Sequence, residues 1–167
     1  NYLESPLINN PNAFAREADG SLYVADLNTG ISVVSPNEIH QATIDPNLTM
    51  RLPAGVVSFE NKLFVGDYRN NRIVVLDEST GKVLSEWSSE HMMDPEGITA
   101  DDKGNIYVAS YGNGKILKFL KDGTFVKEWS NASLDGKLSL VHPHGIFVTE
   151  GKVYVTELFG DISVLVY

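Results

Sequence analysis

Short apolar runs alternate with turns rich in glycine, asparagine and aspartate along the chain, and residues 95–129 show the pattern most clearly. Four β-favouring runs in this segment are separated by turns at 101–105, 111–114 and 121–123. Short strands joined by such turns are typical of antiparallel hairpins. The segment therefore predicts a four-stranded antiparallel meander.

This plan occurs four times, and each copy opens on a proline. The prolines are separated by 42, 42 and 48 residues, and they are Pro11, Pro53, Pro95 and Pro143. A period of about 40–50 residues that carries four strands is typical of β-propeller blades and not of helical solenoids. We therefore predict one all-β domain over residues 1–167, a β-propeller of four-stranded antiparallel blades with four blades in this chain.

The ends of the pattern bear on how the ring closes. The fourth copy has no outer strand after its third strand at 162–165, while Asn1, Tyr2 and Leu3 fall in the register of an outer strand. One expectation is that this N-terminal strand completes the last blade and so removes an exposed sheet edge. The other is that the chain is an excised part of a longer propeller, or that the missing blades come from another chain or from a second copy in a homo-oligomer. The outer strand of the first blade is expected near 41–44.

Composition narrows the class of partner. The chain has 167 residues, 43% of them hydrophobic, and 13 basic against 22 acidic side chains, which gives a formal charge of −9. Because this charge repels phosphate backbones and anionic lipids, we expect no nucleic-acid partner. No apolar run approaches the roughly 18–20 residues of a membrane span, so none is expected. The absence of cysteine excludes disulfides and thiolate sites.

Two features bear on localisation. Asn-x-Ser/Thr triplets begin at Asn47 and Asn131 in predicted connections, where a glycan is tolerated. The sequence also lacks an initiating methionine, which suggests a processed chain. We therefore expect an extracytoplasmic or secreted protein.

The four copies resemble the NHL repeat, whose pattern is Pro-x-Gly-Ile, a glycine-containing turn, Ile-Tyr-Val-Ala and then Asn with Arg/Lys-Ile. The resemblance is clearest in 53–76 and 95–119 and extends over nearly the whole chain. It departs in the first copy, where Ala13 replaces the glycine, and in the fourth, where 159–161 replace the Asn-x-Arg segment. NHL-like propellers include interaction modules, RNA-binding domains and metal-dependent enzymes such as amidating lyases, streptogramin lyases and gluconolactonase-like hydrolases. Fold resemblance alone does not choose among them.

One ring of side chains is the strongest candidate for chemistry. The first strand of each propeller blade lines the central channel, so the residues after the four prolines meet at one mouth. They are Asn12, Ala54, Glu96 and His144. Amide oxygen, carboxylate and imidazole together can bind a divalent cation, Ca²⁺ or Zn²⁺. The resemblance points the same way, because Pro-His-Gly-Ile at 143–146 is similar to segments that carry zinc-ligating histidines in the amidating lyases.

We therefore predict Asn12, Glu96 and His144 as metal ligands, with His144 also as the catalytic residue in the role of ligand or general base. Three histidine ligands cannot be assembled from this ring. The alternative is a polar channel mouth, in which the three side chains only bond one another and ordered water.

A further set of candidates follows the second strands. Tyr68, Arg69 and Arg72 form a basic turn with an aromatic side chain, and Phe159 lies in the corresponding turn of the fourth copy. Arginine and aromatic residues are favoured as interface anchors, so we predict these four as ligand-binding residues. The alternative is that these side chains are ordinary surface residues of loops without a binding role.

The polar residues that end the second strands form a second ring, and they are Asp26, Asp67, Ser110 and Glu157. A short polar side chain before a Gly/Asn turn caps backbone N–H groups. We therefore interpret this ring as structural.

The leading functional hypothesis is a non-catalytic β-propeller that serves as a binding or structural module for a protein or a small ligand. It is motivated by a regular repeat that lacks a complete catalytic constellation. The alternative is a divalent-metal-dependent hydrolase or lyase, lactonase-like or amidating-lyase-like, with its site at the channel mouth.

Overall fold

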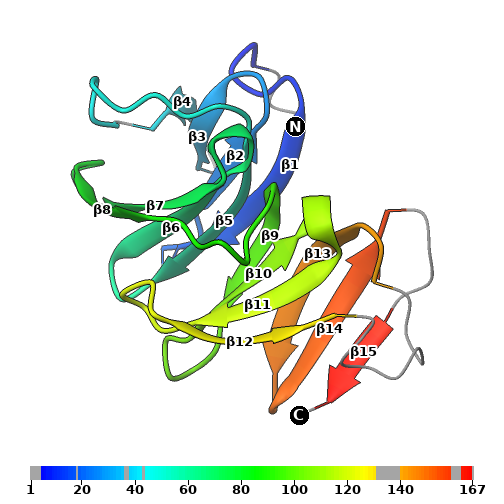
Figure 1. Ribbon diagram of the computed structural model, residues 1–167. Coiled ribbons are helices and arrows are strands. Elements are labelled where there is room, and N and C mark those ends of the chain that lie inside the picture. The colour runs from blue at the N-terminus through cyan, green and yellow to red at the C-terminus, as the bar shows by residue number, and fades with distance from the viewer. Residues whose placement is uncertain are drawn as a thin grey trace.

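The residues that the computed structural model describes are 5–17, 19–35, 38–42, 44–130 and 140–158, together with the backbone of 163–166. They form four antiparallel sheets that stand side by side in an arc, from the first at the top of Figure 1 to the last at the lower right. Three sheets have four strands, and the fourth has three within this part of the chain. The predicted all-β propeller architecture with four blades is therefore confirmed.

Blade 1 consists of β1 Pro11–Arg16, β2 Leu22–Asp26, β3 Gly30–Val34 and β4 Ile39–Gln41. Blade 2 consists of β5 Pro53–Phe59, β6 Lys62–Asp67, the single 3₁₀ turn η1 Tyr68–Asn70, β7 Arg72–Asp77 and β8 Val83–Trp87. Blade 3 consists of β9 Pro95–Ala100, β10 Ile106–Ser110, the 3₁₀ turn η2 Tyr111–Asn113, β11 Lys115–Phe119 and β12 Phe125–Trp129. Blade 4 consists of β13 Pro143–Thr149, β14 Lys152–Glu157 and β15 Ser163–Val166.

Strand positions agree with the hydrophobic pattern except at the outer strand of blade 1. Residues Ile39 to Gln41 pair with β3, ahead of the predicted 41–44. Ala42 and Ile44 come after β4 and pack on the core between blades 1 and 2, which explains their apolar character. The N–H of Ala42 still donates to the carbonyl oxygen of Ile31 in β3. The proposed closing strand, Asn1 to Leu3, lies outside the described residues.

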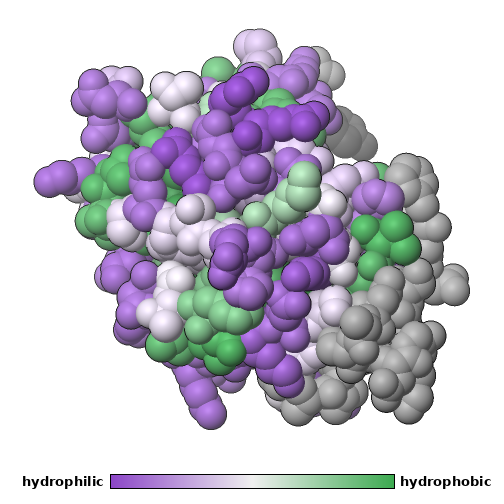
Figure 2. Space-filling view, in the orientation of Figure 1, coloured by the Kyte–Doolittle hydropathy of each residue, from purple (hydrophilic) through white to green (hydrophobic). Residues whose placement is uncertain are grey.

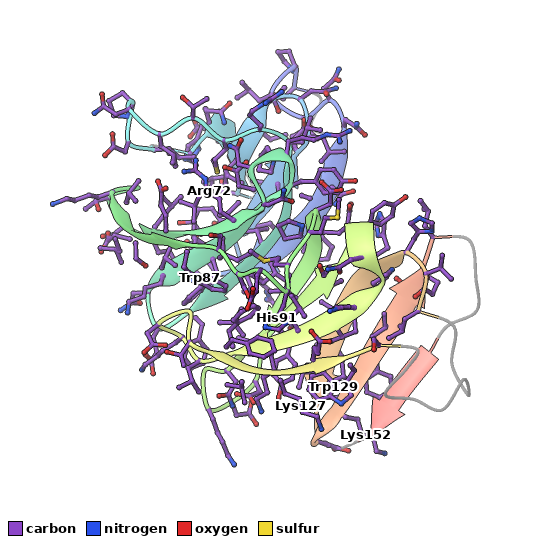
Figure 3. All side chains as sticks on the ribbon, viewed as in Figure 1. Arg72, Trp87, His91, Lys127, Trp129 and Lys152 are labelled. Atoms are coloured by element: carbon purple, nitrogen blue, oxygen red, sulfur yellow. The ribbon has the colours of Figure 1, made fainter. Side chains whose placement is uncertain are left out.

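Apolar cores lie between consecutive blades. The first strands are neighbours in the order β1, β5, β9 and β13, and three clusters of buried side chains join the facing sides of the blades. Figure 3 shows Trp87 and Trp129 at corresponding places on the outer strands of blades 2 and 3. Trp87 lies 4.8 Å from Phe119 of the next blade, measured between ring centroids. The repeated tryptophan therefore extends blade packing outward from the centre.

The glycine of the Pro-x-Gly motif sets how closely consecutive blades approach. A Cβ atom on Gly55 would overlap the backbone carbonyl oxygen of Glu96 in the next blade. One on Gly97 would likewise overlap the carbonyl oxygen of His144. Backbone atoms cannot swing aside as a flexible side chain can, so only glycine permits this spacing.

The two ends of the arc expose faces whose equivalents are buried between blades. Phe14 of β1 is 69% exposed, whereas Val56 and Ile98 at the same place in blades 2 and 3 are buried. On the opposite end face, Phe147 of β13 is 59% exposed. Large exposed aromatic side chains at blade-packing positions favour continuation of the ring by further blades. Completion by another chain or a second copy stays a prediction, which the native mass of the protein tests.

The surface in Figure 2 is largely hydrophilic, with separate apolar patches. Helical structure in the described ranges includes only the short turns η1 and η2, and no helix there is long and apolar enough to cross a membrane.

Replacing Gly97 by alanine tests the spacing between blades. Because the new methyl group would meet the carbonyl of His144, we expect Gly97→Ala to lower the free energy of unfolding by about 1–3 kcal/mol, the usual range for overpacking. Urea denaturation measures the change.

Gly145→Ala is the matched control, since Gly145 has the same place in the motif of blade 4. A Cβ there meets only the side chain of Thr156 among the described residues, so a smaller loss is expected. The close approach of backbones would not be the determining constraint if Gly97→Ala were as stable as the wild type.

Candidate functional site

The candidate site begins with an irregularity at the start of each first strand. The pairing of the first and second strands shifts register between Pro11 and Ala13 in blade 1, and directly after the opening proline in the other three blades. A β-bulge of this kind re-aims a side chain. The residue after each proline can therefore leave the regular alternation of the strand at the mouth of the arc.

Three of the four predicted ring residues meet at this mouth. The side-chain amide of Asn12 donates hydrogen bonds to the carbonyl oxygen of Ala54, at 3.1 Å, and to Oε1 of Glu96, at 2.9 Å. Nε2 of His144 lies 3.3 Å from the same Oε1. Blades 1 and 4 thus each bring a side chain to the carboxylate of Glu96 on blade 3. Blade 2 supplies a backbone acceptor for Asn12.

The carboxylate at the centre of this cluster is more buried than its partners. The side chain of Glu96 is 10% exposed and that of His144 is 34% exposed. Both contacts described above use Oε1 of Glu96, and Oε2 has no hydrogen-bond partner within the described residues. The mouth therefore offers one carboxylate oxygen and a half-exposed imidazole to a ligand.

The metal hypothesis requires more donors than this cluster supplies. Within the described ranges, no group of three or more histidine, cysteine, aspartate or glutamate residues is placed to hold a metal ion. Glu96 and His144 provide two such donors and Asn12 an amide, whereas a catalytic zinc site uses three imidazole, carboxylate or thiolate ligands. These residues do not form a zinc site by themselves, and metal binding by them stays a prediction.

A row of rings borders the polar cluster. The ring of Tyr68 in η1 lies 6.1 Å from that of Tyr111 in η2, and the ring of Tyr111 lies 4.8 Å from that of His142, measured between centroids. Burial raises the pKa of Tyr68, and the charges of Asp94 and Glu96 raise it further. Tyr68 and Tyr111 follow the residues that pair with Pro53 and Pro95, so these rings form the rim of the mouth.

Sequence reasoning found Tyr68 but missed Tyr111. Tyr111 follows the last residue of its second strand as Tyr68 follows Asp67, so the repeat itself carried a usable indication. The approach of His142 to Tyr111 depends on how blades 3 and 4 pack.

The predicted arginines divide between the rim and the scaffold. The guanidinium of Arg69 lies over the ring of Tyr68, 5.2 Å from its centroid. Arg72 instead bonds Asp67 at 2.8 Å and also pairs with Glu86. Lys115 makes the equivalent ion pair with Glu128 in blade 3, at 2.9 Å, so the basic residue of the repeat has a structural use in both blades. Binding by Arg72 stays a prediction, and Phe159 lies outside the described residues.

The side chains that end the second strands hold the segments leading to the prolines. Asp26 accepts hydrogen bonds from the backbone N–H groups of Asn9 and Asn10. Asp67, Ser110 and Glu157 accept the equivalent bonds from Arg51, Met93 and Val141, each two residues before the proline of its own blade. The second ring is therefore structural, as predicted, but Asp67 and Ser110 hold the segment before the proline and make no capping bond to the backbone of the turn that follows them.

The segments so held are strained. Leu52 and Asp94 directly precede Pro53 and Pro95, and their φ angles are 59° and 49°. The left-handed region is costly for side chains other than glycine and persists where the surrounding structure imposes it. The capping bonds and the following bulges are what fix the post-proline residues at the mouth.

Comparisons with known proteins agree with the propeller architecture. Residues 92–118 match the SBBP family model, described as a beta-propeller repeat. A stretch of 70 residues is 27% identical to peptidyl-alpha-hydroxyglycine alpha-amidating lyase 1 of Drosophila melanogaster, and it covers 39% of this chain and 13% of that protein.

Solved structures extend the match over nearly the whole chain. A catalytically inactive histidine-to-alanine variant of virginiamycin B lyase from Staphylococcus aureus, with Quinupristin, aligns with a TM-score of 0.74 and 18% identity over 98% of this chain and 54% of that one. A gluconolactonase from Xanthomonas campestris aligns with a TM-score of 0.68 and 15% identity over 90% of this chain and 55% of that one. The chain thus spans about half the length of these structures. Its fold is a β-propeller.

The second ring gives a test that depends on pH. Burial alone would raise the pKa of Asp26, but hydrogen bonds from the backbone of Asn28, Asn9, Thr29 and Asn10 outweigh it and hold the pKa below its ordinary value. Asp26→Asn should lower the free energy of unfolding by about 1–3 kcal/mol at neutral pH, because charge-assisted bonds are lost.

The same contribution should vanish in acid. A lowered pKa stabilises the folded state above the ordinary carboxyl pKa, and this stability is lost as the pH falls through the folded-state value. Urea unfolding across the acid range should therefore show the wild type losing more stability than Asp26→Asn. Asp102→Asn, at an exposed turn, is the control and should change stability by less than about 0.5 kcal/mol. Equal acid sensitivity of wild type and Asp26→Asn would contradict this account.

Proposed function

We propose that the protein is a binding module whose mouth face takes a small ligand with hydrogen-bond donors and an aromatic or apolar part. The observation that carries the proposal is that the side chains of Asn12 and His144, from blades 1 and 4, meet the carboxylate of Glu96 on blade 3. Polar groups brought together from distant parts of a chain are typical of ligand sites.

The chemistry of the ligand follows from the two parts of the mouth. Oε2 of Glu96 accepts hydrogen bonds and favours a donor or a cationic group. The rings of Tyr68 and Tyr111 offer flat apolar faces beside it, and such faces also attract cations. A ligand that combines an amine or hydroxyl donor with an aromatic or aliphatic body uses both. An exposed protein segment that carries the same groups would bind in the same manner.

Ligand-observed NMR with a fragment library of aromatic amines tests this proposal. Fragments that bind the wild type should bind Glu96→Gln and His144→Ala at least about tenfold more weakly, since a charged hydrogen bond contributes roughly 1.5–3 kcal/mol. Circular dichroism verifies that both variants keep the fold. Asp102→Asn is the surface control and should bind as the wild type does. Fragments that bind both mouth variants with unchanged affinity would place the site elsewhere.

A second candidate is a divalent-metal-dependent hydrolase or lyase that uses the same mouth. It is favoured by the 3.3 Å separation of His144 Nε2 and Glu96 Oε1. A carboxylate beside an imidazole orients it to accept a proton, as general bases require. The matches to an amidating lyase and to a gluconolactonase support this candidate, but they cover only part of those proteins. The cluster lacks a third strong donor, so a metal here needs one from outside these three side chains.

Metal analysis separates the two candidates. If the protein is such an enzyme, it should retain Ca²⁺ or Zn²⁺ at one ion per mouth and hydrolyse a lactone or cleave a peptidyl-hydroxyglycine. His144→Ala should then lose the metal and reduce turnover by about a hundredfold or more, the usual contribution of a general base. Chelation followed by dialysis should abolish turnover in the wild type. A metal-free protein without turnover in the presence of added Ca²⁺ or Zn²⁺ leaves the binding module as the function.

We further propose that the protein acts outside the cytoplasm. Asn47 supports this, because it is exposed and so accessible to glycosylation, whereas Asn131 lies outside the described residues. The mass of the protein from a secreting host, before and after glycan removal, checks the proposal.

A further inference from the structure

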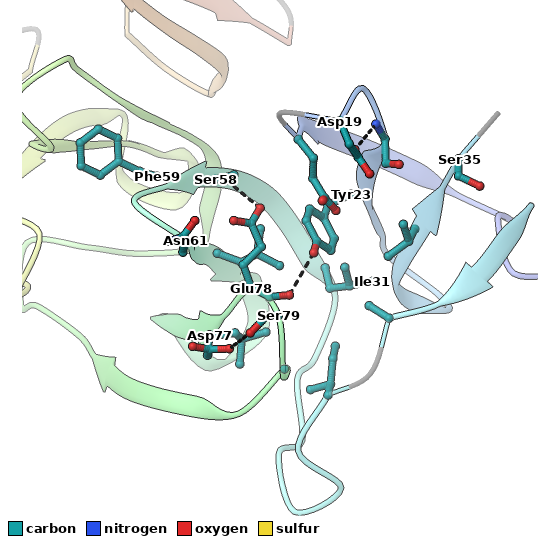
Figure 4. A pocket seen from close by; sticks show the side chains of 18 of the residues that line it. Asp19, Tyr23, Ile31, Ser35, Ser58, Phe59, Asn61, Asp77, Glu78 and Ser79 are labelled. Atoms are coloured by element: carbon teal, nitrogen blue, oxygen red, sulfur yellow. Dashed lines mark hydrogen bonds between the residues drawn. The ribbon is translucent and has the colours of Figure 1, made fainter.

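A separate cavity lies between blades 1 and 2, on the face opposite the mouth. It is lined by the turns that join the first and second strands and by the end of β7, whereas the mouth is formed where the first strands begin. Its volume is about 1200 Å³. Figure 4 shows its side chains facing one another across the gap between the two blades.

Part of the lining of this cavity is apolar. Its aliphatic residues belong to the core between blades 1 and 2, in which Ile31, Leu63 and Leu76 are buried and Val33, Ala42 and Ile44 are partly buried. Phe59 adds an aromatic ring. A ligand that covers this surface would bury aliphatic groups, which is favourable by about 25 cal/mol per Å².

The charged part of the lining is acidic. Five carboxylates contribute to it, and the residues are Glu17, Asp19, Glu60, Asp77 and Glu78. Lysine and arginine are absent from the lining of this cavity in the described structure, and His40 is its one basic residue. Glu60 pairs with Lys121 at 2.9 Å. Within the described part of the chain, the other four carboxylates form no ion pair, whereas Asp67, Glu86 and Glu128 elsewhere do.

Tyr23 shows how strongly these carboxylates act on the interior of the cavity. Its hydroxyl donates a hydrogen bond to the carbonyl oxygen of Glu78 at 3.0 Å and so links the two blades across the gap, as the dashed line in Figure 4 shows. Burial raises the pKa of Tyr23, and the hydrogen bond and charge of Glu17, with the charges of Glu78 and Asp19, raise it further. A group surrounded in this way resists negative charge and favours a cation nearby.

The acidic groups do not converge on a point. The described residues contain no group of three carboxylates or histidines placed to hold a metal ion. Asp77 uses its Oδ1 to hold the turn at Ser79 and Thr80, and Glu78 accepts a hydrogen bond from Ser58 at 2.8 Å. A small ion would therefore meet one carboxylate at a time, whereas a longer molecule can reach several.

We propose that the cavity between blades 1 and 2 binds an elongated aliphatic cation, a linear diamine or polyamine. Its methylene chain lies against the apolar walls, and its ammonium groups reach Glu17 and Asp19 on one side and Glu78 and Asp77 on the other. The ammonium groups neutralise carboxylates at the edge of this cavity that form no ion pair with a side chain of the described structure. This site is independent of the mouth, since the two share no residue.

Isothermal titration with decamethylenediamine at low ionic strength tests this proposal. The wild type should bind it, and the affinity should fall as salt is raised, because exposed charges are screened. Glu17→Gln combined with Glu78→Gln should weaken binding by about tenfold, as expected for two partly exposed ion pairs of up to about 1 kcal/mol each. Glutamine keeps an acceptor for Ser58, so the variant should fold.

Two controls make the result specific. Glu90→Gln removes a carboxylate whose side chain is 92% exposed and lies outside the cavity lining, and it should leave the affinity unchanged. A diamine of equal length with ether oxygens in its chain should bind more weakly, because it gains less from the apolar walls. Unchanged affinity in the double variant, or equal binding of the ether diamine, would overturn the proposal. So would a lysine-rich peptide that binds this face when decamethylenediamine does not.

Discussion

The close approach of neighbouring first strands is the constraint on which the rest of the structure depends. Gly55 and Gly97 admit the carbonyl oxygens of Glu96 and His144 from the next blade, at a distance that a side chain would prevent. This contact fixes the pitch of the arc near its centre, while the apolar cores and the tryptophans of the outer strands fill the widening space between blades. This contact joins blade 2 to blade 3 and blade 3 to blade 4, whereas blade 1 has Ala13 in place of the glycine.

The same contact produces the polar mouth. The contact involves the carbonyl oxygens of Glu96 and His144. The strand positions that bring the blades together therefore also bring the side chains of these two residues to the centre. The bulges after the prolines turn them toward it, and the caps from Asp26, Asp67 and their equivalents hold the segments before the prolines. The scaffold and the candidate site therefore use neighbouring residues of the Pro-x-Gly motif. The glycine packs against the next blade, and the residue before it is free to vary.

The two faces of the arc differ because blade packing weakens with distance from the centre. At the mouth, strands lie close and polar side chains meet across blades. On the opposite face, blades 1 and 2 diverge, and the bond between Tyr23 and Glu78 spans the gap. Apolar core residues are then left beside the acidic turns of both blades. The net negative charge of the whole chain does not identify a partner by itself. It becomes informative once the fold shows that some of the acidic residues lie around a partly apolar cavity.

The sequence by itself determined the blades. Apolar alternation and turn residues located nearly all the strands, and the repeated Pro-x-Gly placed Asn12, Glu96 and His144 in equivalent positions, because local backbone preferences repeat wherever the local sequence repeats. Only the tertiary structure decided what those residues touch: that Glu96 accepts from Asn12 and faces His144, that Tyr111 stands beside His142, and that Arg72 serves the scaffold. It also placed β4 at Ile39–Gln41, ahead of the predicted strand, with Ala42 and Ile44 packed on the core between blades 1 and 2. Contacts between blades join residues some 40 to 80 positions apart and depend on the pitch of the arc, which no local pattern encodes.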